Sequence, residues 1–190
     1  NAMIKNPISG FVSSANQFPA DSTYPYYIRS NNFETYRNRR INDVLRKSDS
    51  ITPQSMMKLQ NDNYNLQAAE SLPFLLSMVD KSSLVGNENQ ILVGLGSWDF
   101  FNQIGSLPAT YYEVWWKTFL AMLWDEMNNE TALLDYPDDF STIYLMKTNP
   151  ELSFYDIRET PQKEDLKTVI NRSFRESAKK IDEWEKKNGK

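Results

Sequence analysis

The sequence predicts a mainly α-helical fold with one short strand near the N-terminus. Apolar residues recur every three or four positions along most of the chain, and Thr-Pro pairs, which commonly start helices, precede two of these runs. Only one short run has the apolar pattern of a strand. The chain has 190 residues, of which 40% are hydrophobic, and this is enough for one sizeable core.

The N-terminal part is predicted to be a strand followed by a loop. The strand-like run covers residues 8–14 and is followed by the turn-prone Ala15-Asn16-Gln17. Residues 17–32 are rich in Pro, Asp, Ser, Tyr and Asn, which favours a loop. We therefore assign residues 4–32 to a strand and loop, and residues 33–190 to a helical lobe.

The helical lobe is predicted from its spacing and its start signals. Helical spacing or a start signal marks residues 33–46, a segment that starts at Thr52-Pro53, and residues 66–79, 88–94 and 111–127. Thr52 is expected to cap the second helix and Asn87 the fourth. Pro73 should kink or restart the third.

The last two helices have the clearest patterns. Residues 111–127 are apolar on nearly every side, so this helix should be central and buried, with its aromatic side chains in the core and not on a binding surface. Thr160 and Pro161 are expected to start a long final helix. Its apolar stripe consists of Leu166, Ile170, Phe174, Ile181 and Trp184.

The composition excludes several classes of site and partner. The chain contains no histidine and no cysteine, which excludes Ser-His-Asp triads, thiol nucleophiles, His/Cys zinc sites and disulfides within it. The net charge is −4 without a basic stripe, which argues against nucleic-acid binding. The longest apolar stretch, residues 111–124, is interrupted by Glu113 and Lys117 and is too short and too polar to span a membrane.

The ends of the sequence predict a piece of a larger protein. Asn1-Ala2 before Met3 is typical of the remnant of a removed affinity tag, so residues 1–3 are assigned to that remnant. The chain then begins at a strand-like run and stops just after a long charged helix. We therefore expect an internal fragment.

An ordered series of motifs runs along the chain. The series is Asn6-Pro7-x-x-Gly10-Phe11-x-x-x-x-Asn16, Tyr24-Pro25, Arg37-x-x-Arg40-Ile41, Thr52, Met56, Leu59-Gln60-x-Asp62, Pro73, Trp98-Asp99, the aromatic segment 111–124 and Tyr155-Asp156. In this order the motifs resemble the β-chain of the penicillin amidase family, whose members are N-terminal-nucleophile (Ntn) hydrolases. The resemblance spans nearly the whole chain and implies a helical lobe cut from an αββα Ntn-hydrolase β-chain.

The resemblance also implies a reaction and two site residues. In this family a serine at the N-terminus of the mature β-chain attacks an amide carbonyl, and its own α-amino group is the base. Asn16 matches the asparagine whose side-chain amide helps to hold the oxyanion. Arg37 matches the arginine that orients this asparagine and the nucleophile. The parent protein is then an acylase for non-peptide linear amides, and the fragment alone should be inactive because it lacks the nucleophile.

Two Gly-Ser pairs resemble the dyad at which these precursors cleave themselves. They are Gly96-Ser97 and Gly105-Ser106. The family places its nucleophile well before the asparagine, and both pairs follow Asn16. We therefore reject both as cleavage sites.

No cofactor or metal is predicted. The loop and turn aspartates do not form an Asp-x-Asp-x-Asp-Gly pattern; they are Asp99, Asp138, Asp139 and Asp156. Some family members hold a structural calcium through a loop carboxylate a few residues after Tyr-Pro. Here that position falls near Ile28, so the sequence does not support calcium in this chain.

Partners and location follow from the resemblance. The implied partners are the remainder of the β-chain, the α-chain and a small-molecule amide substrate, and the implied location is the bacterial periplasm or the exterior. An alternative remains open, in which the chain is a helical binding module that holds a sugar or a peptide in the periplasm or at the cell surface.

Overall fold

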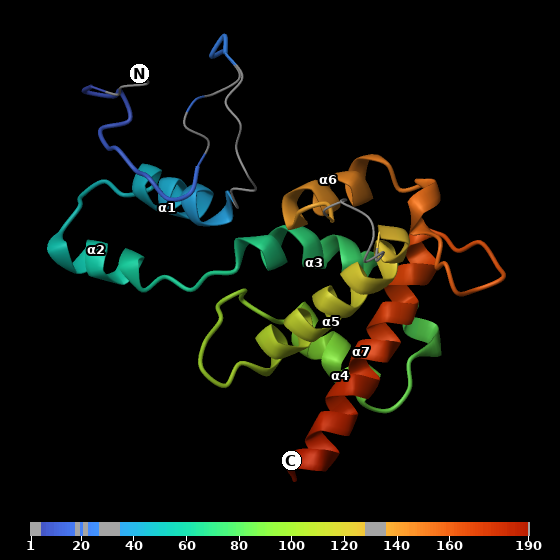
Figure 1. Cartoon of the computed structure of the whole chain (residues 1–190). Helices are drawn as coiled ribbons and strands as arrows, with labels where there is room; N and C mark the ends of the chain where they lie inside the picture. The colour runs from blue at the N-terminus through green and yellow to red at the C-terminus, as the bar shows by residue number, and fades with distance from the viewer. Residues whose placement is uncertain (1–4, 18–19, 21–22, 27–34, 128–135, 190) are drawn as a thin grey trace. The chain divides into compact units, whose positions relative to one another are not determined.

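The computed structural model describes residues 5–17, 20, 23–26, 35–127 and 136–189. The chain divides into two compact units, residues 1–66 and 67–190, and each is described by itself (Figure 1). Their elements are almost entirely helices, which confirms the mainly α-helical fold class. The predicted tag remnant at residues 1–3 and the position near Ile28 lie outside the described residues. The predicted division at residues 32 and 33 stays a prediction.

The first unit contains helices α1 (Tyr36–Arg46) and α2 (Pro53–Gln60). The predicted start of α2 is confirmed. Thr52 Oγ1 accepts a hydrogen bond from the Ser55 N–H at 3.1 Å, and Ser55 Oγ accepts one from the Thr52 N–H at 2.9 Å. This capping box satisfies donors that would otherwise have no partner in the first turn.

An ion pair fixes α1 to the segment that follows α2. The Arg40 guanidinium donates to both oxygens of Asp62, at 3.0 and 2.7 Å, and lies 4.3 Å from the ring centroid of Tyr64. The hydrogen bond from Arg40 lowers the pKa of Asp62 below its ordinary value. Because both side chains are largely shielded from water, this forked contact restrains α1 more firmly than an exposed pair would.

The strand predicted at residues 8–14 is not formed. Residues 7–10 make a turn instead, closed by a hydrogen bond of 3.0 Å from the Gly10 N–H to the Pro7 carbonyl, with a φ of +74° at Gly10. Residues 11–14 have no regular structure. A strand is stable only when its backbone groups form hydrogen bonds with an adjacent strand. Within the described part of the chain, no strand pairs with this segment.

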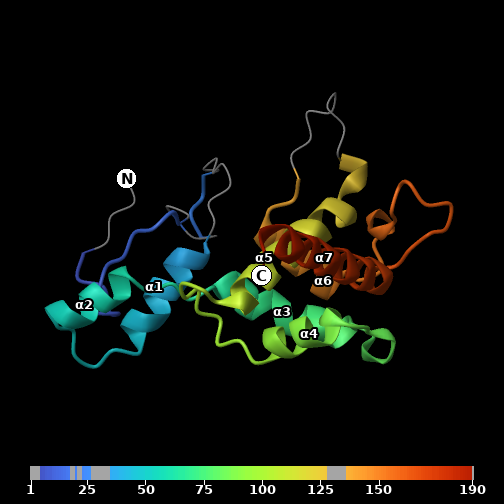
Figure 2. The same ribbon diagram turned by 90° about the horizontal axis from the view of Figure 1, so that it is seen from below.

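The second unit is built around helix α5 (Leu107–Leu123), which packs mainly against α7 (Leu166–Asn188) and also against α4 (Asn87–Gly96). Figures 1 and 2 show α7 running alongside α5 in both views. Helices α3 (Leu66–Met78) and α6 (Asp139–Thr148) and three short 3-10 turns (Lys81–Ser83, Asp125–Met127, Ser153–Tyr155) complete the unit. α3 is continuous through Pro73, so it does not restart there.

The buried centre of this unit confirms the predicted role of the aromatic helix. Trp115 is 1% exposed and Phe174 is 0% exposed, and their ring centroids lie 4.9 Å apart in an edge-to-face arrangement. The Trp115 indole N–H donates to Ser173 Oγ at 3.1 Å, so its polar atom is also satisfied. The helix begins earlier than predicted, at Leu107 with Ser106 as its cap, and ends at Leu123.

Two predicted helix starts were wrong. Asn87 does not cap α4 but is its first residue, and its side chain donates to the Ala178 carbonyl and to Asp182 Oδ1 in α7, at 3.3 and 3.2 Å. Thr160 does not cap α7 because its hydroxyl is held by Glu164 Oε1 at 2.6 Å. Asp165 caps α7 instead and accepts from the Thr168 N–H at 2.7 Å.

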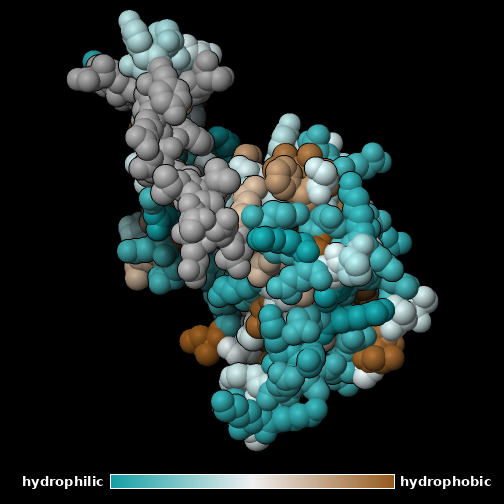
Figure 3. All heavy atoms as spheres, turned by 45° about the vertical axis from the view of Figure 1, so that its right-hand side comes forward, coloured by the Kyte–Doolittle hydropathy of each residue, from teal (hydrophilic) through white to brown (hydrophobic). Residues whose placement is uncertain are grey.

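Most side chains on the face shown in Figure 3 are polar. Figure 3 shows one face, on which apolar side chains occur in separate spots. Trp184, which was expected to continue the buried stripe of α7, is 54% exposed, whereas the other four residues of the stripe are buried. No helix within the described ranges is both long enough and apolar enough to cross a membrane.

The half-buried carboxyl group of Glu126 makes the stability of this unit depend on pH. Burial, together with the negative charges of Asp125 and Asp156, raises the pKa of Glu126 above its ordinary value of 4.5. The fold therefore favours the protonated acid. This contribution to stability is fully present below the unfolded-state pKa and is lost as pH rises through the higher folded-state pKa.

Glu126→Gln should therefore stabilise the chain near neutral pH but not in acid. The neutral amide removes a buried negative charge, so the melting temperature at about pH 7 should rise on the order of 2 °C, and the gain should vanish at about pH 3.5. Thermal unfolding followed by circular dichroism at both pH values measures this. Glu151→Gln, at an exposed position, is the control and should change little. An equal gain at both pH values would contradict the assignment.

Candidate functional site

Asn16 lies at the end of the irregular segment 11–17 and is exposed. Its φ is +50°, a left-handed conformation that asparagine adopts more readily than most residues. The side chain therefore projects from a local turn of the chain. The sequence had predicted that it would project from the end of a strand. An exposed amide in a fixed turn can donate to a ligand without a large rearrangement.

Arg37 is the direct partner of Asn16. It lies in the first turn of α1, and its guanidinium donates a hydrogen bond to Asn16 Oδ1. A guanidinium has only donors, so the amide atom that faces it must be the oxygen. The amide nitrogen Nδ2 then points away from Arg37, and no hydrogen bond within the described part of the chain occupies it. The two residues predicted for the site are therefore in contact.

Further amides surround this pair. Asn38 Nδ2 donates to Gln17 Oε1 and, at 3.5 Å, to Ser13 Oγ. Ser13 Oγ in turn donates to Asn42 Oδ1 at 3.1 Å, and Asn42 Nδ2 donates to the Asn38 carbonyl at 2.8 Å. Asn38 and Asn42 were not predicted from the sequence. The two residues are four positions apart, which places them on one face of a helix. This spacing is the sequence feature from which they could have been predicted.

The arrangement supplies a hydrogen-bond donor but no activated nucleophile. Ser13 is the serine that lies in the network, and its hydroxyl donates to an amide oxygen, which is too weak a base to take its proton. The chain has no histidine or cysteine to act in its place. What this site can do by itself is stabilise negative charge on a ligand oxygen next to Asn16 Nδ2.

The two rejected Gly-Ser pairs have local structural surroundings. Ser97 Oγ donates to the Gly94 carbonyl at 3.2 Å at the end of α4. Ser106 Oγ accepts from the Ala109 N–H at 3.3 Å and caps α5. Both hydroxyls thus take part in the ends of helices.

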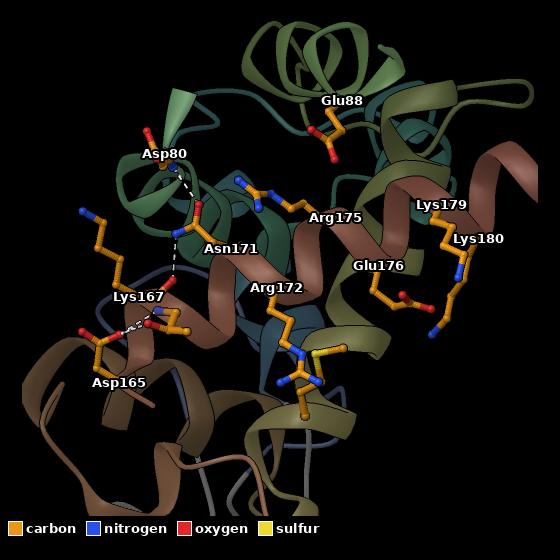
Figure 4. Close-up of a pocket in the computed structure, with 12 residues that line it drawn as sticks. Asp80, Glu88, Asp165, Lys167, Asn171, Arg172, Arg175, Glu176, Lys179 and Lys180 are labelled. Atoms are coloured by element: carbon orange, nitrogen blue, oxygen red, sulfur yellow. Dashed lines mark hydrogen bonds between the residues drawn. The ribbon is translucent and has the colours of Figure 1, made fainter. Parts of the chain in front are cut away.

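An open groove in the second unit is a separate candidate. Figure 4 shows acidic and basic side chains around it, several of them from α7. Several of these groups already have partners: Asn171 Oδ1 accepts from the Asp80 N–H at 2.7 Å, and Arg175 donates to Ser83 Oγ at 2.5 Å. Across the described ranges, no three His, Cys, Asp or Glu side chains stand close enough to hold a metal ion. The mixture of acidic and basic side chains around the groove does not favour one class of ligand.

Comparison with known protein families gives a match over the full length of the chain. A model of the penicillin amidase family matches residues 1–190, which is the whole chain. No curated protein and no solved structure matches.

Proposed function

The chain belongs to the penicillin amidase family, and from this premise we propose that it supplies the oxyanion asparagine of an acylase that hydrolyses a non-peptide linear amide. Family membership supports a hydrolase as the parent protein. In the proposed enzyme Asn16 is the side-chain oxyanion donor and Arg37 holds it in place. The contact between Arg37 and Asn16 Oδ1 carries the proposal, because it engages the amide oxygen and leaves Nδ2 as the atom that would donate to a ligand.

The proposed reaction proceeds through an acyl-enzyme. The hydroxyl of an N-terminal serine attacks the amide carbonyl and gives its proton to its own α-amino group. Negative charge develops on the carbonyl oxygen, where Asn16 Nδ2 donates a hydrogen bond that strengthens as the charge grows. The tetrahedral intermediate collapses, the amine leaves with the transferred proton, and water then hydrolyses the serine ester.

The nucleophile comes from outside this chain in the proposed enzyme. Ser13 is close to Asn16 but donates to an amide oxygen, so nothing activates it. We therefore propose that the remainder of the β-chain and the α-chain complete the site. Export to the periplasm or the exterior, as is usual in the family, is part of the same proposal.

The alternative of a helical binding module depended on exposed aromatic side chains. Trp115, Trp116 and Trp124 lie in the core, at 1%, 4% and 2% exposed. They are therefore not available as a platform for a sugar or a peptide. Other aromatic side chains are exposed, among them Tyr144 at 59% and Trp184 at 54%, so the binding module stays the second candidate.

The proposal predicts that amide hydrolysis requires the complete enzyme. The complete enzyme should release the chromophore from a chromogenic phenylacetyl amide or a related acyl amide, whereas this chain alone should not. Absorbance assays with equal concentrations of both species measure this. Hydrolysis by this chain alone, abolished by Asn16→Ala, would contradict a nucleophile from outside. Saturable sugar or peptide binding by a complete protein that cleaves no amide would favour the binding module.

A further inference from the structure

We propose that Asn38 and Asn42 are positioning residues for the oxyanion site: they fasten segment 13–17 to α1, so that Asn16 presents Nδ2 in one orientation. This inference rests on the proposed function of Asn16. It extends the site from a pair of residues to a bracket that consists of Arg37, Asn38 and Asn42.

Asn38 contacts the chain on both sides of Asn16. Its Nδ2 donates to the side chain of Gln17, the next residue, and to Ser13 Oγ, three residues before Asn16, at 3.5 Å. Arg37 meanwhile holds Asn16 itself. Two neighbouring residues of α1 therefore restrain the segment at three points, which limits both its translation and its rotation.

Asn42 ties the bracket together one helical turn further on. Its Oδ1 accepts from Ser13 Oγ at 3.1 Å, and its Nδ2 donates to the Asn38 carbonyl at 2.8 Å. Ser13 is thus held by both asparagines. The forked ion pair between Arg40 and Asp62 restrains α1 itself, so the bracket stands on an anchored helix.

Segment 13–17 needs such a bracket because, among the described residues, no neighbouring strand holds it by backbone hydrogen bonds. Among the described residues, its hydrogen bonds to α1 come from side chains, and the nearest bond between backbone groups is the turn from Gly10 to Pro7. Asn16 is exposed and left-handed, so burial does not fix it either. An oxyanion donor must stay within a narrow range of positions, and a displacement of about 1 Å can cost about 100-fold in rate.

The test compares two variants at position 38 in the complete enzyme. Asn38→Leu keeps the size of the side chain and removes the donor, so kcat should fall about 10-fold with little change in KM. Asn38→Asp should stay within about 3-fold of the wild type, because Gln17 can turn its amide and donate to the new carboxylate. Asp43→Ala, on the same helix in an exposed pair with Lys47, is the control and should not change kcat.

A double-mutant cycle separates positioning from a merely structural role. If Asn38 acts through Asn16, Asn38→Leu should lower kcat in the wild type but have no further effect in the Asn16→Ala background. An equal fall in both backgrounds would overturn positioning, as would a wild-type kcat in Asn38→Leu while Asn16→Ala is impaired. A wild-type kcat in Asn16→Ala would instead overturn the proposed function.

Discussion

Asn16→Ala should lower kcat of the complete enzyme by about 10²–10³-fold, the usual loss when one oxyanion donor is removed. Asn16 Nδ2 interacts with charge that develops only in the transition state, so KM should change little. Steady-state kinetics with a chromogenic acyl amide measures both constants. Because the Arg37 guanidinium contacts the amide oxygen Oδ1, the donor that is lost in Asn16→Ala is Nδ2.

A matched control uses another exposed asparagine of the same unit. Asn61 follows α2, and its side chain donates to the Met57 carbonyl at 2.8 Å, away from the bracket. Asn61→Ala should leave kcat within about 2-fold of the wild type. Equal activities of Asn16→Ala and Asn61→Ala would show that Asn16 has no part in the reaction.

Phe174→Ala should lower the free energy of unfolding of the second unit by about 3–5 kcal/mol. Phe174 is fully buried, and its ring lies edge-to-face with that of Trp115 at the main contact between α5 and α7. Alanine would leave a cavity that rigid neighbouring helices fill only in part. Urea unfolding followed by tryptophan fluorescence measures the loss.

Trp184→Ala on the same helix is the control for this prediction. Trp184 is 54% exposed, so its truncation should change the free energy of unfolding by about 0.5 kcal/mol or less. A comparable loss in both variants would mean that α7 does not face α5 as described.

The helices that could be predicted from sequence are those whose signals are local. Thr52 and Ser55 make a capping box that needs no other part of the chain, so the start of α2 was located correctly. The start of α7 was misplaced although its signals are also local: the Thr160 hydroxyl bonds to Glu164, and Asp165 caps the helix instead. α6 was not predicted, and Phe140 and Tyr144 on it are largely exposed, so its sequence has no clear buried stripe.

The two residues Asn16 and Arg37 of the candidate site were selected from the sequence, but the local structure around them was not predicted. The family pattern selected Asn16 and Arg37, and their side chains are in contact. Their roles in catalysis stay predictions. The apolar pattern of residues 8–14 suggested a strand, but a ladder depends on a distant partner that a single sequence does not specify. Asn38 and Asn42 were missed because polar residues on a helix usually face water.

The most direct test of Asn16 as the oxyanion donor is the affinity of a transition-state analogue. An arylboronic acid forms a tetrahedral, negatively charged adduct with a serine nucleophile and imitates the intermediate, unlike the planar substrate. Its inhibition constant should be measured for the complete wild-type enzyme and for Asn16→Ala, together with KM for the amide. We expect the inhibition constant to rise about 10²-fold or more while KM stays nearly constant. An unchanged inhibition constant would contradict an oxyanion role for Asn16.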